Sequence, residues 1–224
     1  MIDLDKFGSY GAFKWTHEYL VQVLTTGKNP IIKKQNLLTA IRTIKREDFV
    51  PENLKDQAYD DKDLNVGYGC ILNKPTIIAE MLNIIQPLWG GHYLDIGTGS
   101  GYIAALLGMA AGENGKVYSV ERVQFLSDIA KINLAKYPQI KNVEIYLKDG
   151  SLGLKEFAPY DGIHCSVAFE KVPEFISNQL KIGGRFVCPT VNNDIRLIER
   201  EGEDKFKETI TKGYFFENVQ QGIQ

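Results

Sequence analysis

The pattern of apolar and polar positions changes partway along this 224-residue chain, from helical spacing to alternating strands and helices. In the first part, apolar residues recur at helical spacing over 37–44, and Pro51 ends the predicted helix because proline disfavours helical geometry in the residue before it. A second helix is predicted to begin near Pro75, since proline is tolerated in a first helical turn. The polar, glycine-containing segment 59–75 is predicted to be an irregular or extended loop.

Farther along the chain, short apolar runs of strand length alternate with segments of helical spacing. This alternation indicates an α/β fold with a Rossmann-like, doubly wound and mostly parallel sheet, preceded by an N-terminal helical extension. The segments 195–201 and 205–211 flank a turn and predict an antiparallel C-terminal hairpin at the sheet edge. The other predicted strands lie at 92–97, 116–121, 143–147, 160–168 and 185–190, and the predicted helices between them at 102–112, 123–136 and 172–180.

The amino-acid composition argues against several classes of function. The chain has 26 basic and 28 acidic residues and a formal net charge of −2, so we expect no general nucleic-acid binder. The cysteines Cys70, Cys165 and Cys188 are widely spaced and suit a reducing compartment rather than a disulfide framework or a zinc motif. No histidine pair has metal-ligand spacing, so no metal site is predicted. No apolar stretch of about 18 residues and no secretory signal occurs, so we expect no membrane association and a cytoplasmic location.

The sharpest motif is the glycine-rich turn Gly97-Thr98-Gly99-Ser100-Gly101, which joins a predicted strand to a predicted helix. Glycines at such a turn let the backbone approach a ligand closely. The dinucleotide fingerprint would need a further glycine at position 102, where this chain has tyrosine, and the phosphate-binding P-loop pattern is absent. The turn therefore indicates a ligand other than NAD or a nucleoside triphosphate.

Acidic residues follow the next two predicted strands. Glu121 lies 20 residues after Gly101, where a carboxylate can accept hydrogen bonds from ribose hydroxyls. Asp149-Gly150 follows the third strand, where Asp149 could accept from the amino group of adenine. Each feature alone could be an ordinary turn or a solvated strand end. Their placement at three successive strand ends favours S-adenosylmethionine, which has a ribose and an adenine but no phosphates.

With these motifs in place, the chain resembles the protein-L-isoaspartate O-methyltransferase family from about residue 17 to residue 220. The matching segments include LDIGTGSGY, VYSVER, QLKIGGRFVCPT and REDFVPENLKDQAYDDKDLNVGYG. The glycine turn is generic to class I methyltransferases, whereas the segment 46–80 is specific to this family. The resemblance implies methyl transfer from S-adenosylmethionine to the carboxylate of isoaspartyl or D-aspartyl residues in damaged proteins, with S-adenosylhomocysteine as product. The methyl ester then closes to a succinimide, which reopens partly to normal aspartate.

The resemblance also implies an organisation and a site. We expect a single domain over 1–224, with a helical and substrate-loop region (1–75), a cofactor-binding core (76–190) and a C-terminal hairpin and tail (191–224). The expected partners are proteins or peptides that contain isoaspartyl residues, and the chain is expected to be a monomer. Val219-Gln220 weakly match a region near substrate and cofactor. The cofactor-binding residues implied by the resemblance are Cys70, Ile71, Leu72, Asp95, Gly97, Thr98, Gly99, Gly101, Glu121, Arg122, Asp149 and Gly150.

Two segments depart from the family pattern. The family loop usually reads Q-T-I-S-x-P-H, and this chain has Asn73 where the family has its active-site serine. Asn73 could be a helix N-cap alone, or it could cap the helix and also contact substrate, because its amide group donates hydrogen bonds to a carboxylate. The segment 166–171 is bulkier and more charged than the family's alanine-rich loop, so the substrate mouth could be narrower or differently charged.

The implied chemistry is an in-line displacement at a sulfonium methyl group. The substrate carboxylate has a reference pKa of about 4 and is ionised at neutral pH, so no general base is needed. Asn73 is the predicted catalytic residue, and His164 is predicted to be a packed, hydrogen-bonded histidine. Two alternatives stay open: a methyltransferase of the same fold with another target, such as a peptide, a small acid or RNA, and a cofactor-binding module with little turnover.

Overall fold

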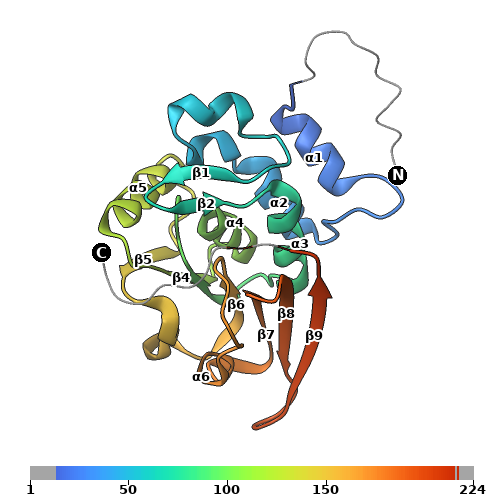
Figure 1. The fold of residues 1–224 in the computed structure, drawn as a ribbon, viewed down its shortest axis with the longest axis vertical. Helices are drawn as coiled ribbons and strands as arrows, with labels where there is room; N and C mark the ends of the chain where they lie inside the picture. Colours follow the sequence, from blue (N-terminus) through green and yellow to red (C-terminus); the bar gives the residue numbers. More distant parts are fainter. Residues whose placement is uncertain (1–13, 215, 217–224) are drawn as a thin grey trace.

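The computed structural model describes residues 14–214 and 216. Its main sheet has seven strands in the order β5-β4-β3-β6-β7-β8-β9 (Figure 1). The pairs from β5 to β7 are parallel, and β7–β8 and β8–β9 are antiparallel, which confirms the predicted fold class and its C-terminal hairpin. The strands are β3 (His92–Ile96), β4 (Lys116–Glu121), β5 (Val143–Leu147), β6 (Tyr160–Cys165), β7 (Leu180–Thr190), β8 (Asp194–Arg200) and β9 (Phe206–Lys212).

Helices cover both faces of this sheet. Successive strand residues point to opposite faces, and in β3 the neighbours Tyr93 and Leu94 belong to two different hydrophobic clusters. α4 is almost entirely buried because α2 packs on it, which explains why it is apolar around its whole circumference. The helices are α1 (His17–Thr25), α2 (Gln35–Thr43), α3 (Pro75–Ile85), α4 (Tyr102–Ala111), α5 (Gln124–Ala135) and α6 (Glu174–Ser177), with 3-10 turns η2 (Arg46–Phe49), η3 (Glu52–Gln57), η4 (Gly150–Leu152) and η5 (Lys155–Phe157).

The segment predicted as an irregular or extended loop contains a small antiparallel hairpin, formed by β1 (Leu64–Gly67) and β2 (Cys70–Leu72). Its tip, 67–69, has three consecutive residues with positive φ, and two of them are glycines that adopt this geometry without strain. The strands are too short for apolar alternation to reveal them. This hairpin is separate from the main sheet (Figure 1).

Three other boundaries differ from the predictions. The first predicted helix ends at Thr43 rather than at Pro51, and η2 occupies the intervening chain. The predicted helix 172–180 is reduced to the four residues of α6, because Leu180 already pairs with Tyr160 as the start of β7. β6 ends at Cys165 instead of continuing to residue 168, and Phe169 then forms an isolated bridge with Thr190 at the end of β7.

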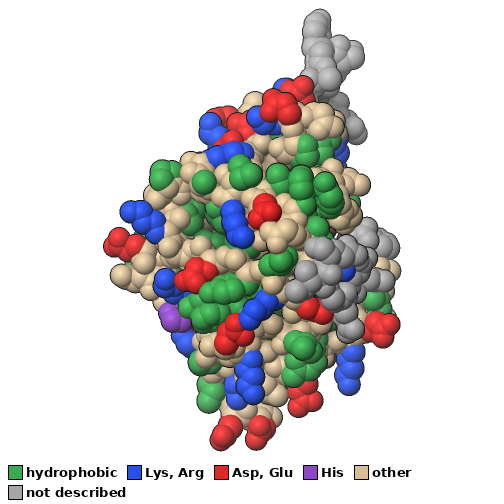
Figure 2. Space-filling view, turned by 90° about the vertical axis from the view of Figure 1, so that its left-hand side faces the viewer, with side chains coloured by type: hydrophobic (Ala, Val, Ile, Leu, Met, Phe, Trp, Pro, Cys, Tyr) green, Lys and Arg blue, Asp and Glu red, His purple; other side chains and the backbone are tan. Residues whose placement is uncertain are grey.

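Charges of both signs are interspersed on the face shown in Figure 2, as the near-balance of 26 basic and 28 acidic residues leads one to expect. Within residues 14–214, no helix has both the length and the apolar character that crossing a bilayer requires.

Candidate active site

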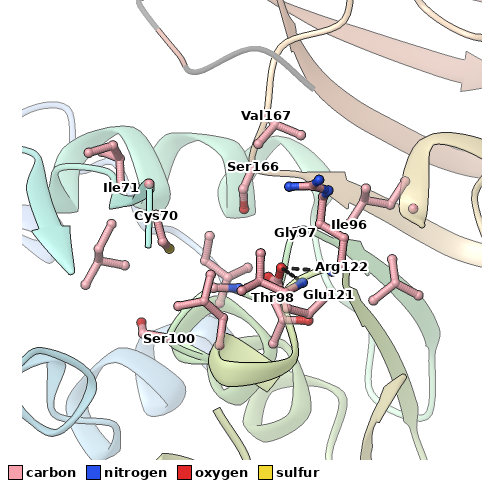
Figure 3. A pocket seen from close by; sticks show the side chains of 18 of the residues that line it. Cys70, Ile71, Ile96, Gly97, Thr98, Ser100, Glu121, Arg122, Ser166 and Val167 are labelled. Carbon is pink, nitrogen blue, oxygen red and sulfur yellow. Dashed lines mark hydrogen bonds between the residues drawn. The ribbon is translucent and has the colours of Figure 1, made fainter. Parts of the chain in front are cut away.

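A pocket opens at the carboxyl ends of β3, β4 and β6, and the β1–β2 hairpin covers one side of it. Ligands bind at this end of the strands in open parallel sheets. Figure 3 shows Cys70 and Ile71 on the hairpin side, Thr98 on the glycine turn with Glu121 of β4 beside it, and Ser166 just after β6. The wall residues are Tyr68, Gly69, Cys70, Ile71, Leu72, Asn73, Ile96, Gly97, Thr98, Gly99, Ser100, Tyr102, Ile103, Val120, Glu121, Arg122, Val123, Leu126, Gly150, Ser151, Ser166 and Val167.

The glycine turn is held by hydrogen bonds to the neighbouring strand β4. The amides of Gly97 and Thr98 donate to the Val120 carbonyl at 3.0 and 3.1 Å. Gly99 has a φ of +53°, and a Cβ atom there would lie 2.7 Å from the Cys70 sulfur. The missing side chain therefore allows the hairpin to pack directly against the turn.

Glu121 is the organising carboxylate of the pocket. Its Oε2 accepts a 2.8 Å hydrogen bond from the Gly99 amide, and its Oε1 accepts from the Arg122 and Val123 amides at 2.8 and 3.0 Å. A carboxylate has about four lone-pair sites, so roughly one acceptor position remains for a ligand. Because Glu121 is buried and lines the pocket, a ligand hydroxyl that fills this position is shielded from water.

A buried chain of hydrogen bonds runs beneath the glycine turn. The Asp95 carboxylate lies 2.8 Å from His164 Nδ1 and accepts a 2.8 Å hydrogen bond from Ser119 Oγ. Ser119 Oγ lies 2.6 Å from Thr98 Oγ1. Ser119 donates its single hydroxyl proton to Asp95, so the Thr98 hydroxyl is the donor in its contact with Ser119. The Thr98 hydroxyl therefore retains only acceptor capacity for a ligand.

Asp95 lies beneath the pocket rather than in its wall. The family resemblance implied that Asp95 binds the cofactor, whereas in the structure the residue is fully buried and is not a wall residue of the pocket. Asp95 is linked to the pocket wall through Ser119, whose hydroxyl contacts Thr98. His164 is buried and hydrogen-bonded, as predicted.

We expect Thr98→Val to weaken S-adenosylhomocysteine binding about tenfold, because valine keeps the shape of threonine but removes the acceptor from a ligand donor. Isothermal titration calorimetry of the purified variant measures this change. Thr209→Val, on the exposed edge strand β9, is the matched control and should bind as the parent does. Unchanged affinity in Thr98→Val would show that the hydroxyl does not meet the cofactor.

The other expected cofactor residues divide into two groups. Gly150 lines the pocket together with Ser151, whereas Asp149 does not line it and accepts a 2.8 Å hydrogen bond from the Ser151 amide. A contact between Asp149 and adenine stays a prediction. Gly101 does not line the pocket either; a Cβ atom at this position would lie 3.1 Å from Cβ of Ala130, so the glycine lets α5 pack closely on the turn. Val219-Gln220 lie outside the described residues.

Asn73 lines the pocket, but it is not the N-cap of α3, and the capping interpretation is wrong. The helix begins at Pro75, as predicted, and its N-cap residue is Lys74 rather than Asn73. Asp61 and Asp63 accept the hydrogen bonds of the Thr76 and Lys74 amides instead. The Asn73 carboxamide is buried at the pocket wall and forms no hydrogen bond with any other residue in 14–214 or with residue 216. Its hydrogen-bonding groups are therefore available to a ligand.

Two polar residues of the pocket wall, Ser100 and Ser166, were not predicted as site residues from the sequence. Ser100 Oγ is buried and has no hydrogen-bond partner in the described part of the chain, which fits a pocket completed by a polar ligand. Ser166 was noted only as part of a bulkier loop, yet its side chain lies at the pocket (Figure 3). Burial, with a smaller contribution from the Glu121 charge, raises the pKa of the Cys70 thiol to about 12. Cys70 is therefore a neutral wall residue and not a thiolate nucleophile.

The similarity to known proteins covers far more of the chain than the glycine turn. The chain matches the family model for protein-L-isoaspartate(D-aspartate) O-methyltransferase over residues 16–222. A protein-L-isoaspartate O-methyltransferase from Methanocella arvoryzae is 38% identical over 161 residues, which cover 71% of this chain and 85% of that protein. A protein-L-isoaspartate O-methyltransferase 2 from Cupriavidus necator is 35% identical over 210 residues, which cover 85% of this chain and 67% of that protein.

Two solved structures share the fold. A Plasmodium falciparum protein described as a protein-L-isoaspartate O-methyltransferase, in complex with S-adenosylhomocysteine, superposes with a TM-score of 0.78 at 21% identity and covers 91% of this chain and 98% of its own. A second protein-L-isoaspartate O-methyltransferase structure has a TM-score of 0.78 at 27% identity and covers 92% of this chain and 66% of its own. Since the family match runs from the N-terminal helices through the hairpin wall and the glycine turn to residue 222, the chain belongs to the protein-L-isoaspartate(D-aspartate) O-methyltransferase family.

Proposed function

We propose that this chain uses S-adenosylmethionine to methylate the carboxylate of isoaspartyl residues in damaged proteins. The observation that carries the proposal is the reach of the family match, which includes the hairpin that forms the pocket wall as well as the glycine turn. A glycine turn alone supports only a class I methyltransferase. The hairpin is the part of the pocket that distinguishes this family, and it brings Asn73 to the wall.

Different residues along the carboxyl edge of the sheet are suited to different parts of the cofactor. Glu121 ends β4 and has an acceptor position suited to a ribose hydroxyl, with Gly150 and Ser151 beside it as the adenine end. Gly97, Thr98 and Gly99 follow β3 and form the middle of the pocket. We infer that Cys70, Ile71, Leu72 and Arg122 complete the cofactor wall, because all four line the same cavity.

Methyl transfer to a carboxylate requires little acid–base catalysis from the protein. When bound, S-adenosylmethionine supplies an electrophilic methyl group on a positively charged sulfonium. The substrate carboxylate, with a reference pKa of about 4, is ionised at neutral pH and needs no general base. The chain therefore has two tasks, to orient that carboxylate and to exclude water. The Asn73 amide can donate to a carboxylate oxygen, and the apolar side chains of Ile71 and Leu72 help to keep the site dry.

The decisive experiment measures methyl transfer from labelled S-adenosylmethionine to two matched peptides, one with isoaspartate and one with normal aspartate. We expect base-labile labelling of the isoaspartyl peptide alone, because the ester forms on a carboxylate that only this peptide presents. Asn73→Ala should lower kcat/KM for that peptide about 100-fold, since a misplacement of about 1 Å can cost that much, while S-adenosylhomocysteine affinity stays within about threefold of the parent. Asn73→Ser should retain labelling, because a hydroxyl also donates to a carboxylate.

Other outcomes have distinct meanings. Labelling that appears only in Asn73→Ser would mean that the fold is kept but the parent acts on another substrate. Tight cofactor binding without transfer to either peptide by any variant would favour a binding module over an enzyme. Unchanged kcat/KM in a folded Asn73→Ala protein would remove Asn73 from the mechanism.

A further inference from the structure

The backbone is held on both sides of Asn73. The Leu72 carbonyl, which precedes Asn73, accepts a 3.2 Å hydrogen bond from Arg46 Nη2. The Lys74 amide, which follows it, donates a 2.7 Å hydrogen bond to Asp63 Oδ1. Both peptide groups that flank Asn73 are therefore fixed by side chains distant in the sequence. This restrains the backbone dihedral angles that decide where the Asn73 side chain points.

Arg46 is an unusual residue for this task because it is completely buried. Its Nε donates a 2.8 Å hydrogen bond to the Ala58 carbonyl, so one guanidinium joins the two ends of the segment 58–72, which contains the hairpin. Its Cζ lies 5.7 Å from the ring centroid of Tyr102, another wall residue of the pocket. Arg46 Nη1 has no hydrogen-bond partner among the residues that the structure describes.

A buried cation without a contacting carboxylate costs free energy. Burial lowers the pKa of Arg46 to about 10, so the group stays charged at neutral pH. A guanidinium donates in two directions from one rigid plane, which suits two carbonyls that must be held at a fixed separation. A lysine ammonium is a single point on a flexible chain and lacks this geometry. The buried arginine is therefore better explained by a role in fixing the base of the hairpin than by a contribution to overall stability.

We propose that Arg46, assisted by Asp63, is a positioning residue that holds Asn73 at the substrate end of the pocket. The proposal rests on the function proposed above, in which Asn73 orients the substrate carboxylate. Arg46 is not a wall residue of the pocket and acts through the Leu72 carbonyl. Asp63 acts through the Lys74 amide from the opposite side, and Asp61 secures the next turn by accepting from Thr76.

The test compares steady-state kinetics with the isoaspartyl peptide against S-adenosylhomocysteine affinity in the full-length protein. We expect Arg46→Lys to lower kcat/KM about 30-fold and to change cofactor affinity less than about threefold, because the displaced group is Asn73 and not the glycine turn. Asp63→Ala should lower kcat/KM about fivefold, and Asp63→Asn should rescue it, since the carboxamide oxygen accepts the same hydrogen bond. Thermal unfolding of each variant shows whether the protein is folded.

A double-mutant cycle separates this role from general destabilisation. In an Asn73→Ala background, Arg46→Lys and Asp63→Ala should cause little further loss, because the group that they position is already absent. Full additivity in the cycle, or equal losses of kcat/KM and cofactor affinity, would overturn the proposal. If Arg46→Lys fails to fold, the variants Asp63→Ala and Asp63→Asn, at an exposed residue, test the same positioning role. Equal activity of Asp63→Ala and the parent would reject that role.

A parent enzyme that methylates neither peptide would refute the proposed function itself, whereas an active parent with an additive cycle refutes only the positioning role.

Discussion

Replacement of Glu121 by alanine is expected to weaken S-adenosylhomocysteine binding at least about 100-fold and to abolish methyl transfer. The carboxylate accepts hydrogen bonds from three backbone amides, of Gly99, Arg122 and Val123, and it is 5% exposed. A hydrogen bond from a ligand hydroxyl to a charged carboxylate contributes about 1.5–3 kcal/mol, and about 1.4 kcal/mol corresponds to a tenfold change in affinity. The variant loses the acceptor position for the ligand and also the restraint on the glycine turn.

Calorimetric titration with S-adenosylhomocysteine provides the measurement, and Glu144→Ala provides the matched control. Glu144 lies on the adjacent strand β5, is 45% exposed and pairs with Lys116 away from the pocket, so its removal should leave affinity unchanged. Glu121→Gln should fall between parent and alanine, because a carboxamide keeps one acceptor oxygen but loses the other. A folded Glu121→Ala protein that binds S-adenosylhomocysteine as tightly as the parent would contradict the assignment.

Substitution of alanine for Gly101 is expected to lower the melting temperature by about 5–15 °C, from a cost of about 2–4 kcal/mol in a chain of this size. Two terms contribute: a φ of +89°, which strains any residue with a Cβ atom, and contacts of 3.1–3.3 Å with Ala130 on α5. Two of the three contacts are to the Ala130 backbone, so no side-chain rotation relieves them. The helix must move away from the glycine turn instead.

Gly183→Ala separates the two terms in the same thermal-unfolding experiment. Gly183 has a comparable φ of +85°, but no atom lies within 4 Å of its Cβ position. This control should therefore show only the backbone strain, about 1–2 kcal/mol or a shift of about 2–8 °C. Equal shifts in the two variants would mean that the close packing of α5 on the turn contributes nothing.

The sequence predicted well those features that depend on local spacing. β4 and β5 have the predicted bounds, and α3 begins at Pro75 as expected. Apolar periodicity is a local signal, and it distinguishes strands from helices wherever an element is long enough to repeat it. Glu121 was found for a similar reason, because its place at a strand end follows from the order of strands and helices. The hairpin of β1 and β2 was missed because its strands have four and three residues.

The roles of individual side chains were harder to predict from the sequence. The sequence alone determined the α/β class, the place of the glycine turn and the acid after β4, because spacing along the chain carries that information. Only the tertiary structure decided that Asp95 is buried beneath the turn, that Asp61 and Asp63 cap α3 in place of Asn73, and that Arg46 holds the base of the hairpin. These contacts join residues 11 to 26 positions apart, across turns whose geometry no periodic pattern encodes. Hydrogen bonds of this kind depend on where folded elements meet, and that is set by packing rather than by local sequence.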